Sequence, residues 1–237
     1  MSHEDPTPAV SRLYSRWQPP APELLTPRRL ELRRLGDAIR VVIHRLVATD
    51  ADLDAITAAA DALERIAGDF AQVENASTYD GFAEATLAGD AMGALFEQSP
   101  FIGRANPLAP PVRIWEDGDA VGGEVTFDTA YEGPPGCVHG GYIAGAFDEV
   151  LGATHTLSGR AGMTATLTVR YRSPTPLHQL LTFRGWITEV ADRKIFTAAT
   201  LHAGDRLCAE ADAVFISVDV SVFQRLHAER ADRDRRP

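Results

Sequence analysis

The sequence predicts an α+β fold in which a curved antiparallel β-sheet wraps around one central α-helix, preceded by a helical extension. Two strand-like runs come before a glycine-rich helix candidate that begins near residue 139, and four more strand-like runs follow it. Because short turns join the later runs, we expect those four strands to form an antiparallel meander. The segment 26–103 carries helix signals instead.

The chain of 237 residues divides into four predicted segments. We expect an extended arm over 1–25, a helical extension over 26–103, the sheet-and-helix domain over 104–220 and a charged tail over 221–237. An arm is favoured at the start because prolines interrupt helices and sheets. The prolines concerned are Pro6, Pro8, Pro19, Pro20 and Pro22.

The sequence predicts two helices and a weaker helical candidate in the extension. Thr26 followed by Pro27 is typical of a helix start. The apolar stripe expected on this first helix consists of Leu35, Ile39, Val42 and Leu46. A second helix is expected to start at Thr49 or Asp50 and to stop at Gly68, and the segment 82–96 is a weaker helical candidate.

Strand signals dominate after residue 111. The runs 112–115 and 122–127 are joined by a hairpin-like connection, and the later strands are expected over 163–172, 180–190, 194–202 and 206–219. In the run 163–172 the side chains alternate, which predicts one polar and one apolar face. The polar set is Thr164, Thr166, Thr168, Arg170 and Arg172.

The segment 138–149 carries the chemistry that the sequence suggests. A turn-forming run at 131–136 precedes it, and a helix can begin near His139. Ile143, Phe147, Val150 and Leu151 recur at three- and four-residue spacing, so this helix should be buried. The first N–H groups of such a helix lack partners within it and can stabilise a carbonyl oxygen that becomes an oxyanion.

Helix geometry separates the two ends of this segment. Asp148 follows His139 by nine residues, about 13 Å along the axis and on nearly the opposite side of the helix. One helix therefore cannot bring both residues to one carbonyl group. We expect the carboxylate of one subunit to face the glycine-rich helix start of another, as a symmetric dimer allows.

Composition excludes several classes of function. A net charge of −10 and a pI near 5.1 disfavour nucleic-acid binding. No apolar run reaches the length of a transmembrane helix, and two cysteines give no disulfide framework. Because the first residues also lack an apolar signal core, a cytoplasmic location is expected.

Four short motifs then suggest a family. They are His139-Gly140-Gly141 with Asp148, Met163-Thr164-Ala165, Tyr171 with Pro174 and Pro176, and Asp192-Arg193-Lys194. In this order and spacing, the stretch 112–219 resembles the hotdog-fold acyl-CoA thioesterases, in particular their PaaI-like branch. The resemblance implies hydrolysis of an acyl-CoA thioester at a site shared between subunits of a homo-oligomer. It implies no cofactor, because coenzyme A is part of the substrate.

The resemblance also implies roles for single residues. Asp148 corresponds to the catalytic carboxylate, which acts as general base or nucleophile, and Thr164 to a hydroxyl that holds the attacking water. Glu149 is the alternative base if the register differs by one residue. Gly141 supplies the oxyanion N–H, Gly140 permits close approach, and His139 orients the thioester carbonyl.

Basic residues complete the predicted site. In the family, positions matching Arg170, Arg172, Arg193 and Lys194 approach the phosphates and pantetheine of coenzyme A. Arginine suits phosphate because its planar guanidinium donates two parallel hydrogen bonds.

Several alternatives stay open. Cys137 beside His139 could act as a thiol nucleophile, whereas a metal site is disfavoured because no second Cys/His cluster completes it. A hydratase or dehydratase on the same fold and a non-catalytic acyl-CoA-binding module are the rival functions. The acyl group, the choice between dimer and tetramer, and the role of the N-terminal helices are left undetermined by the sequence.

Overall fold

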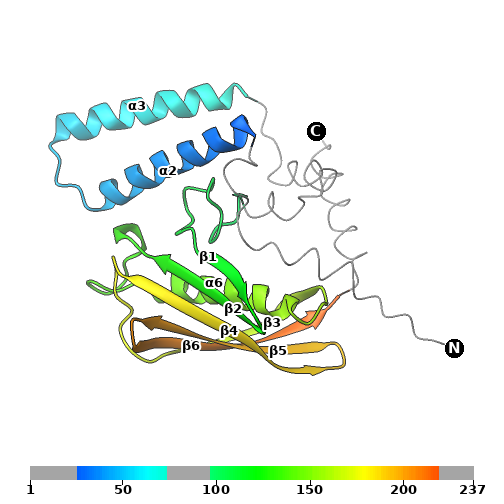
Figure 1. Ribbon diagram of the computed structural model, residues 1–237. Helices are drawn as coiled ribbons and strands as arrows, with labels where there is room; N and C mark the ends of the chain where they lie inside the picture. Colours follow the sequence, from blue (N-terminus) through cyan, green and yellow to red (C-terminus); the bar gives the residue numbers. More distant parts are fainter. Residues whose placement is uncertain (1–25, 74–96, 219–237) are drawn as a thin grey trace.

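A computed structural model describes residues 26–73 and 97–218 (Figure 1). The arm over 1–25, the helical candidate at 82–96 and the tail over 221–237 lie outside the described residues. The elements, in chain order, are α2 (Pro27–Val47), α3 (Leu53–Ala71), β1 (Arg113–Asp117), β2 (Ala120–Thr126), η2 (Thr129–Tyr131), α6 (Gly140–Thr156), β3 (Gly162–Tyr171), β4 (Leu180–Ala191), β5 (Lys194–Ala203) and β6 (Arg206–Ser217).

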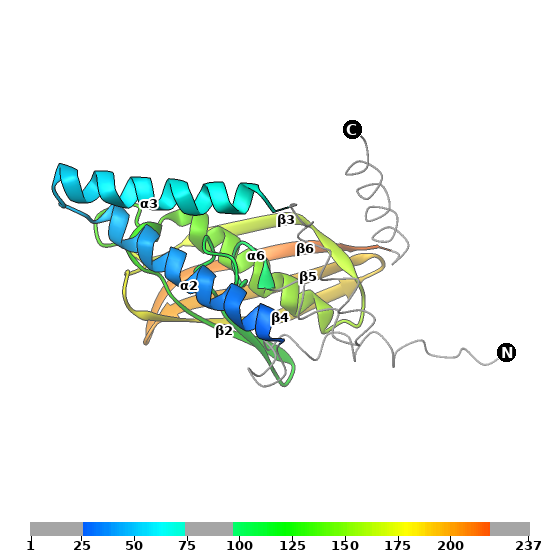
Figure 2. The same cartoon turned by 90° about the horizontal axis from the view of Figure 1, so that it is seen from above.

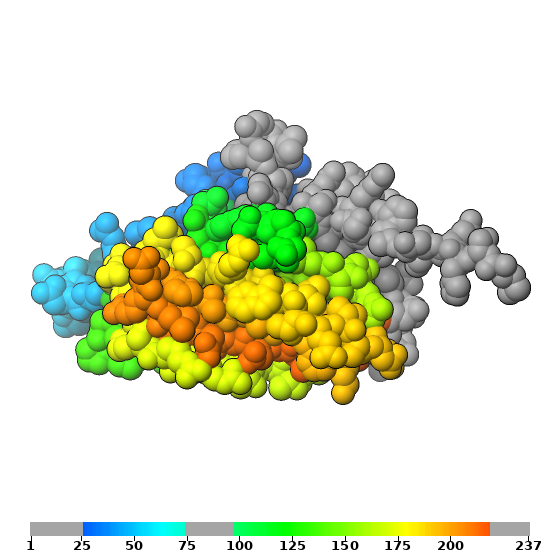
Figure 3. Space-filling view, turned by 60° about the horizontal axis from the view of Figure 1, so that its bottom comes forward, coloured from blue at the N-terminus to red at the C-terminus, as the bar shows by residue number. Residues whose placement is uncertain are grey.

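The sheet has six strands in the order β1-β2-β4-β5-β6-β3, and every neighbouring pair is antiparallel. Helix α6 lies along one face of this curved sheet and contacts five of its strands, β2 to β6 (Figure 2). Figure 3 looks towards the opposite side, where the yellow to orange strands form an open surface. The α+β fold with a central helix, predicted from the sequence, is confirmed.

The predicted four-strand meander is wrong in one respect. β3 pairs with β6 at the edge of the sheet, and β4 pairs with β2. The chain between β3 and β4 crosses from the β3 edge of the sheet to the position beside β2. On the way it is hydrogen-bonded to the segment that precedes α6. There Val138 N–H donates to the Thr175 carbonyl at 2.9 Å, and Leu177 N–H donates to Gly136 at 3.2 Å. Only β4, β5 and β6 therefore form a meander.

The core lies between α6 and the sheet. His139 is the N-cap of α6, as the sequence predicted, and Phe147, Val150 and Leu151 are fully buried. They pack in one apolar cluster with residues such as Phe215. Each such side chain contributes roughly 1.5–3 kcal/mol through burial, which explains why a helix with so many glycines is held firmly against the sheet.

A β-bulge in β3 changes the predicted alternation of faces. Thr164 pairs with Phe215 and Thr166 with Val214, so Ala165 is an extra residue in the strand. Residues that pair directly share a face, and Phe215 is buried under α6. Thr164 therefore lies on the α6 side, whereas Thr166 lies on the outer side. The prediction that both residues share one polar face is wrong, because the extra residue in the bulge interrupts the alternation of side chains between the two faces.

The two N-terminal helices form, with shifted details. Thr26 caps α2 by accepting from Arg29 N–H at 3.3 Å, as predicted. α3 instead begins after Asp52, whose Oδ1 accepts from Ala55 N–H at 2.8 Å, and it continues past Gly68. A glycine inside a helix costs only about 1 kcal/mol relative to alanine, so Gly68 does not end it.

The packing of α2 also departs from its predicted apolar stripe. Val42 and Leu46 are exposed, and the buried residues are Arg33 and Gly36. Arg33 forms an ion pair with Glu97, and a Cβ at Gly36 would lie 2.8 Å from a backbone oxygen. The buried positions are therefore polar or small, while Leu35 and Ile39 of the predicted stripe are partly buried. α3 has no buried residue, and none of the helices in the described ranges has the length and apolarity needed to span a membrane.

Candidate active site

Asp148 and Thr164 meet at the open edge of the molecule. The Thr164 hydroxyl donates to Asp148 Oδ1 at 3.0 Å, from β3 to α6. Both side chains are exposed. The bulge in β3 produces this contact because it turns Thr164 towards α6. A carboxylate and a hydroxyl at hydrogen-bonding distance can hold a water molecule between them and remove its proton.

The start of α6 is held by a second group of contacts. The Gly141 N–H donates to Nδ1 of His139 at 3.0 Å, so the predicted oxyanion donor is paired within its own turn. The Tyr171 hydroxyl donates to the Gly140 carbonyl at 2.7 Å, and a Cβ at Gly140 would lie 3.1 Å from that hydroxyl oxygen. Glycine at 140 therefore permits close packing of Tyr171, which the sequence had not assigned to any role.

The chain does not bring these two groups together. Gly141 and Asp148 are seven residues apart on α6, about 10 Å along the axis. His139, Gly141, Asp148 and Thr164 are all exposed. They therefore lie in two separate exposed groups along the α6 and β3 edge, at the separation that helix geometry predicts.

Glu149 has a different environment from Asp148. It is half-buried, and the Ser99 hydroxyl donates to its Oε1 at 3.0 Å. Burial raises the pKa of Glu149, and the neighbouring charge of Asp148 acts in the same direction, while the Ser99 hydrogen bond opposes both. Ser99 also accepts the N–H groups of Phe101 and Ile102. Glu149 thus anchors the 99–102 turn on α6.

The predicted coenzyme A contacts fall into two sets. Arg170 lies in β3 and Arg172 directly follows it, and they form ion pairs with Asp212 and Glu210 of β6, respectively. Arg170 pairs with Glu210 across the strands, on the outer side that Thr166 and Thr168 share. The structure therefore does not bring Arg170 to Asp148.

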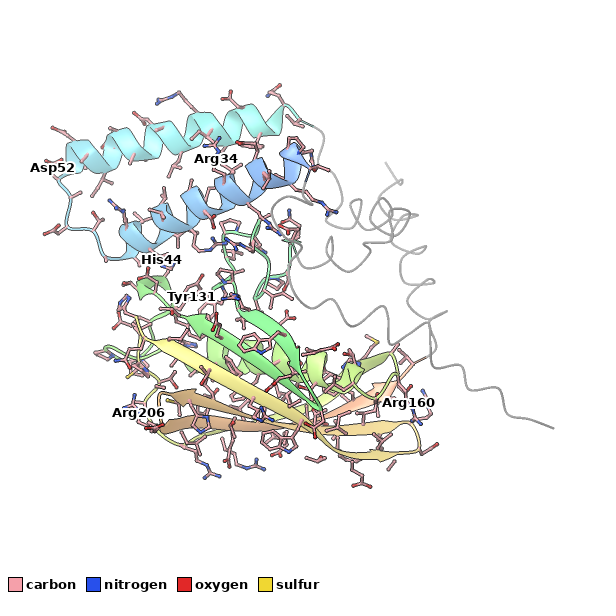
Figure 4. All side chains as sticks on the ribbon, in the orientation of Figure 1. Arg34, His44, Asp52, Tyr131, Arg160 and Arg206 are labelled. Carbon is pink, nitrogen blue, oxygen red and sulfur yellow. The ribbon has the colours of Figure 1, made fainter. Side chains whose placement is uncertain are left out.

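Arg193 and Lys194 lie at the β4–β5 turn. Arg193 donates to the Ser217 carbonyl at 3.2 Å, and Arg160 donates to the Asp192 carbonyl in the same region (Figure 4). Lys194 and Met163 both pair with Ile216, so this basic group lies beside the start of β3, one residue from Thr164. Arg160 was missed by the sequence reasoning because it stands alone between α6 and β3, outside any motif.

The Cys137 thiol makes no hydrogen bond to a base within the described residues. It is a partly exposed free thiol, and the Nδ1 of neighbouring His139 is engaged by Gly141. Among residues 26–73 and 97–218, no group of three or more His, Cys, Asp or Glu side chains could hold a metal ion.

A cavity of about 540 Å³ lies elsewhere, between α2 and the end of β2. Its walls include Arg40, His44, Asp128, Tyr131 and Leu180, and it does not include Asp148 or Thr164. The contact between Asp148 and Thr164, rather than the cavity, marks the candidate active site, because it brings a carboxylate and a hydroxyl together.

The chain is similar to known proteins. The family model described as thioesterase superfamily matches residues 135–210. The crystal structure of protein RHA08564, a thioesterase superfamily protein, is 35% identical, covers 78% of this chain and 94% of its own, and superposes with a TM-score of 0.67. The chain belongs to the thioesterase superfamily. The family predicted from the four short motifs is thereby confirmed.

Curated relatives match a shorter part of the chain. The acyl-coenzyme A thioesterase THEM4 of Xenopus laevis is 38% identical over 89 residues, which are 37% of this chain and 40% of the relative. The acyl-coenzyme A thioesterase THEM5 of Homo sapiens is 29% identical over 91 residues, which are 38% of this chain and 37% of the relative. The chain thus spans about 40% of the length of the curated relatives it matches.

Proposed function

We propose that this thioesterase superfamily chain is an acyl-CoA thioesterase that hydrolyses its substrate to a free acid and coenzyme A. The observation that carries the proposal is the contact of 3.0 Å between Thr164 and Asp148. Relatives named acyl-coenzyme A thioesterases support the substrate class.

In the proposed reaction, a water molecule held by Thr164 and Asp148 attacks the thioester carbon. Asp148 removes one proton from the water as the new C–O bond forms. The carbonyl oxygen becomes an oxyanion, which accepts the Gly141 N–H at the positive end of α6. The C–S bond then breaks, and the departing coenzyme A sulfur takes the proton from Asp148.

The Gly141 N–H must first be released from His139. Its present acceptor is the Nδ1 of an exposed imidazole, so rotation of that side chain about χ1 frees the donor for the substrate carbonyl. After rotation, the ring lies beside the same carbonyl group and can orient it, which is the role proposed for His139. Gly140 lets Tyr171 pack closely against this turn.

Each proposed site combines Asp148 and Thr164 of one subunit with the helix start of another. The exposure of both half-sites supports this arrangement, since a hydrolase site usually shields its reacting groups from bulk water. β3 is an edge strand with few partly buried positions, and an exposed edge is a template for pairing with a second copy.

We place the phosphates of coenzyme A near Arg193 and Lys194, because these side chains lie beside the start of β3. Arg160 can contribute a third positive charge there. Arg172 and Arg170 can take part only by exchanging Glu210 and Asp212 for phosphate, since both are engaged in ion pairs.

The test is Asp148→Asn, which keeps the shape of the side chain and removes its basicity. We expect thiol release from a panel of acyl-CoAs to fall by about 10²–10⁴, the usual contribution of a general base. Cys137→Ser is the matched control and should retain most activity. Wild-type thiol release by Asp148→Asn would overturn the mechanism, and enoyl-CoA hydration without thiol release would identify the hydratase alternative.

A further inference from the structure

His44 connects the N-terminal extension to the domain that carries the site. It lies in the last turn of α2 and points towards η2 (Figure 4). Its Nδ1 accepts the Ala130 N–H at 3.3 Å, and its ring packs edge-to-face on Tyr131 with centroids 5.3 Å apart. α2 contacts η2 through this region, whereas α3 lies farther from the sheet (Figure 1).

Tyr131 continues this connection to the start of α6. Its carbonyl accepts the His139 N–H at 2.8 Å, which fixes the N-cap residue. Its buried ring packs edge-to-face on Tyr142 with centroids 4.8 Å apart. Tyr142 N–H in turn donates to the His139 carbonyl at 3.0 Å. Gly141 lies between the two residues that Tyr131 holds.

We propose that His44 and Tyr131 are positioning residues, through which α2 fixes the backbone that presents the Gly141 N–H to the substrate. The inference rests on the proposed function and gives the N-terminal extension a part in catalysis. Its physical basis is the short path of contacts from His44 to Tyr131 and from Tyr131 to His139. Oxyanion stabilisation depends on donors that are fixed before the reaction.

The contact requires His44 to be unprotonated at Nδ1, because that nitrogen accepts the Ala130 N–H. Burial lowers the pKa of His44, Asp128 opposes that shift, and Arg40 and His178 reinforce it. Two more titratable groups lie near His44. Tyr131 of η2 packs against its imidazole ring, and Asp37 lines the same cavity as His44. Protonation of His44 should therefore release the η2 turn at acid pH.

The experiment compares His44→Ala with His44→Asn in the full chain. Asparagine can place Oδ1 near the position of Nδ1 and accept the Ala130 N–H at every pH. We expect His44→Ala to lower kcat on the order of tenfold, because small misplacements of a reacting group are costly, with KM nearly unchanged. His44→Asn should retain most of the wild-type kcat. Its kcat should also fall less than that of the wild type as the pH is lowered, because asparagine does not become protonated.

Two further measurements separate positioning from folding. Val42→Ala, at an exposed position of α2, is the matched control and should leave kcat unchanged. Hydrogen exchange should quicken at residues 130–142 in His44→Ala but not in Val42→Ala. Unchanged kcat and exchange in His44→Ala, with Asp148→Asn inactive, would overturn this inference alone. Wild-type activity in Asp148→Asn would instead overturn the proposed function, and hydrogen exchange would still report whether His44 holds the turn.

Discussion

At Gly141, the role of the backbone N–H can be tested apart from the role of the space that glycine leaves open. Its N–H is bonded to His139 in the structure and is proposed to bind the oxyanion during the reaction. Proline at this position removes the N–H and is compatible with the first turn of a helix. We expect Gly141→Pro to lower kcat by about 10²–10³, the usual effect of losing one oxyanion donor, measured by thiol release.

Gly141→Ala is the control for that substitution. It keeps the N–H, and the added Cβ would meet only the exposed ring of His139, at 3.1 Å. We expect kcat within a few-fold of the wild-type value, since the donor that stabilises the oxyanion is retained. Equal losses in Gly141→Ala and Gly141→Pro would show that the space, not the N–H, matters at this position.

His155 couples stability to pH. It is buried at the end of α6 and stacked on Phe215 with centroids 4.4 Å apart. Its Nε2 has no partner among the described residues. Burial lowers the pKa of His155, while the Gly152 carbonyl acts in the opposite direction. The unfolded chain therefore binds a proton more readily than the folded chain.

This difference fixes the sign of the pH dependence. Stability from neutral His155 is present above the ordinary histidine pKa of 6.5 and is lost as pH falls through the lower folded-state value. We expect the free energy of unfolding in urea to decline less between pH 7.5 and pH 5 in His155→Gln than in wild type. Identical declines would mean that His155 does not contribute.

At the scale of elements, the bulge in β3 decides which hydroxyl reaches the site. Thr164 bonds to Asp148, whereas Thr166 lies on the outer face of the same strand. Valine has nearly the shape of threonine and also favours strands. We expect Thr164→Val to lower kcat by roughly tenfold or more as the water loses a positioning contact, and Thr166→Val to leave thiol release unchanged.

The two variants should have similar melting temperatures, because both residues are exposed. Comparable activity in Thr164→Val and Thr166→Val would contradict the proposed role of the hydroxyl. Loss of activity in Thr166→Val alone would contradict it as well.

The elements also explain what the sequence could and could not predict. Apolar spacing and the glycines after His139 were sufficient for α6 and its N-cap, because those signals are local. The pairing of β3 with β6 depends on contacts such as Val138 to Thr175, which join distant parts of the chain. The bulge at Ala165 has no marker in the sequence, since alanine requires no special backbone conformation there. The roles of Tyr171, named in a motif without a function, and of His44, not named at all, could not be predicted for the same reason, because only the fold brings them to Gly140 and to η2.

At the scale of the whole molecule, the proposed site requires two copies of the chain. The Gly141 turn and Asp148 lie about 10 Å apart along one rigid helix, and no side-chain rotation closes that distance. Motion within α6 is also opposed by its buried face. A symmetric dimer would form two complete sites, because each subunit supplies one half of each site.

Hybrid dimers test this directly. We expect Asp148→Asn and Gly141→Pro to be nearly inactive alone, since each damages both composite sites. In a hybrid, one site carries both substitutions and the other carries neither. Co-refolding equal amounts gives half hybrids with one intact site each, so thiol release should recover to roughly a quarter of the wild-type value. Mixing without refolding is the control. No recovery, with hybrids verified by two different affinity tags, would mean that Asp148 and Gly141 act within one subunit.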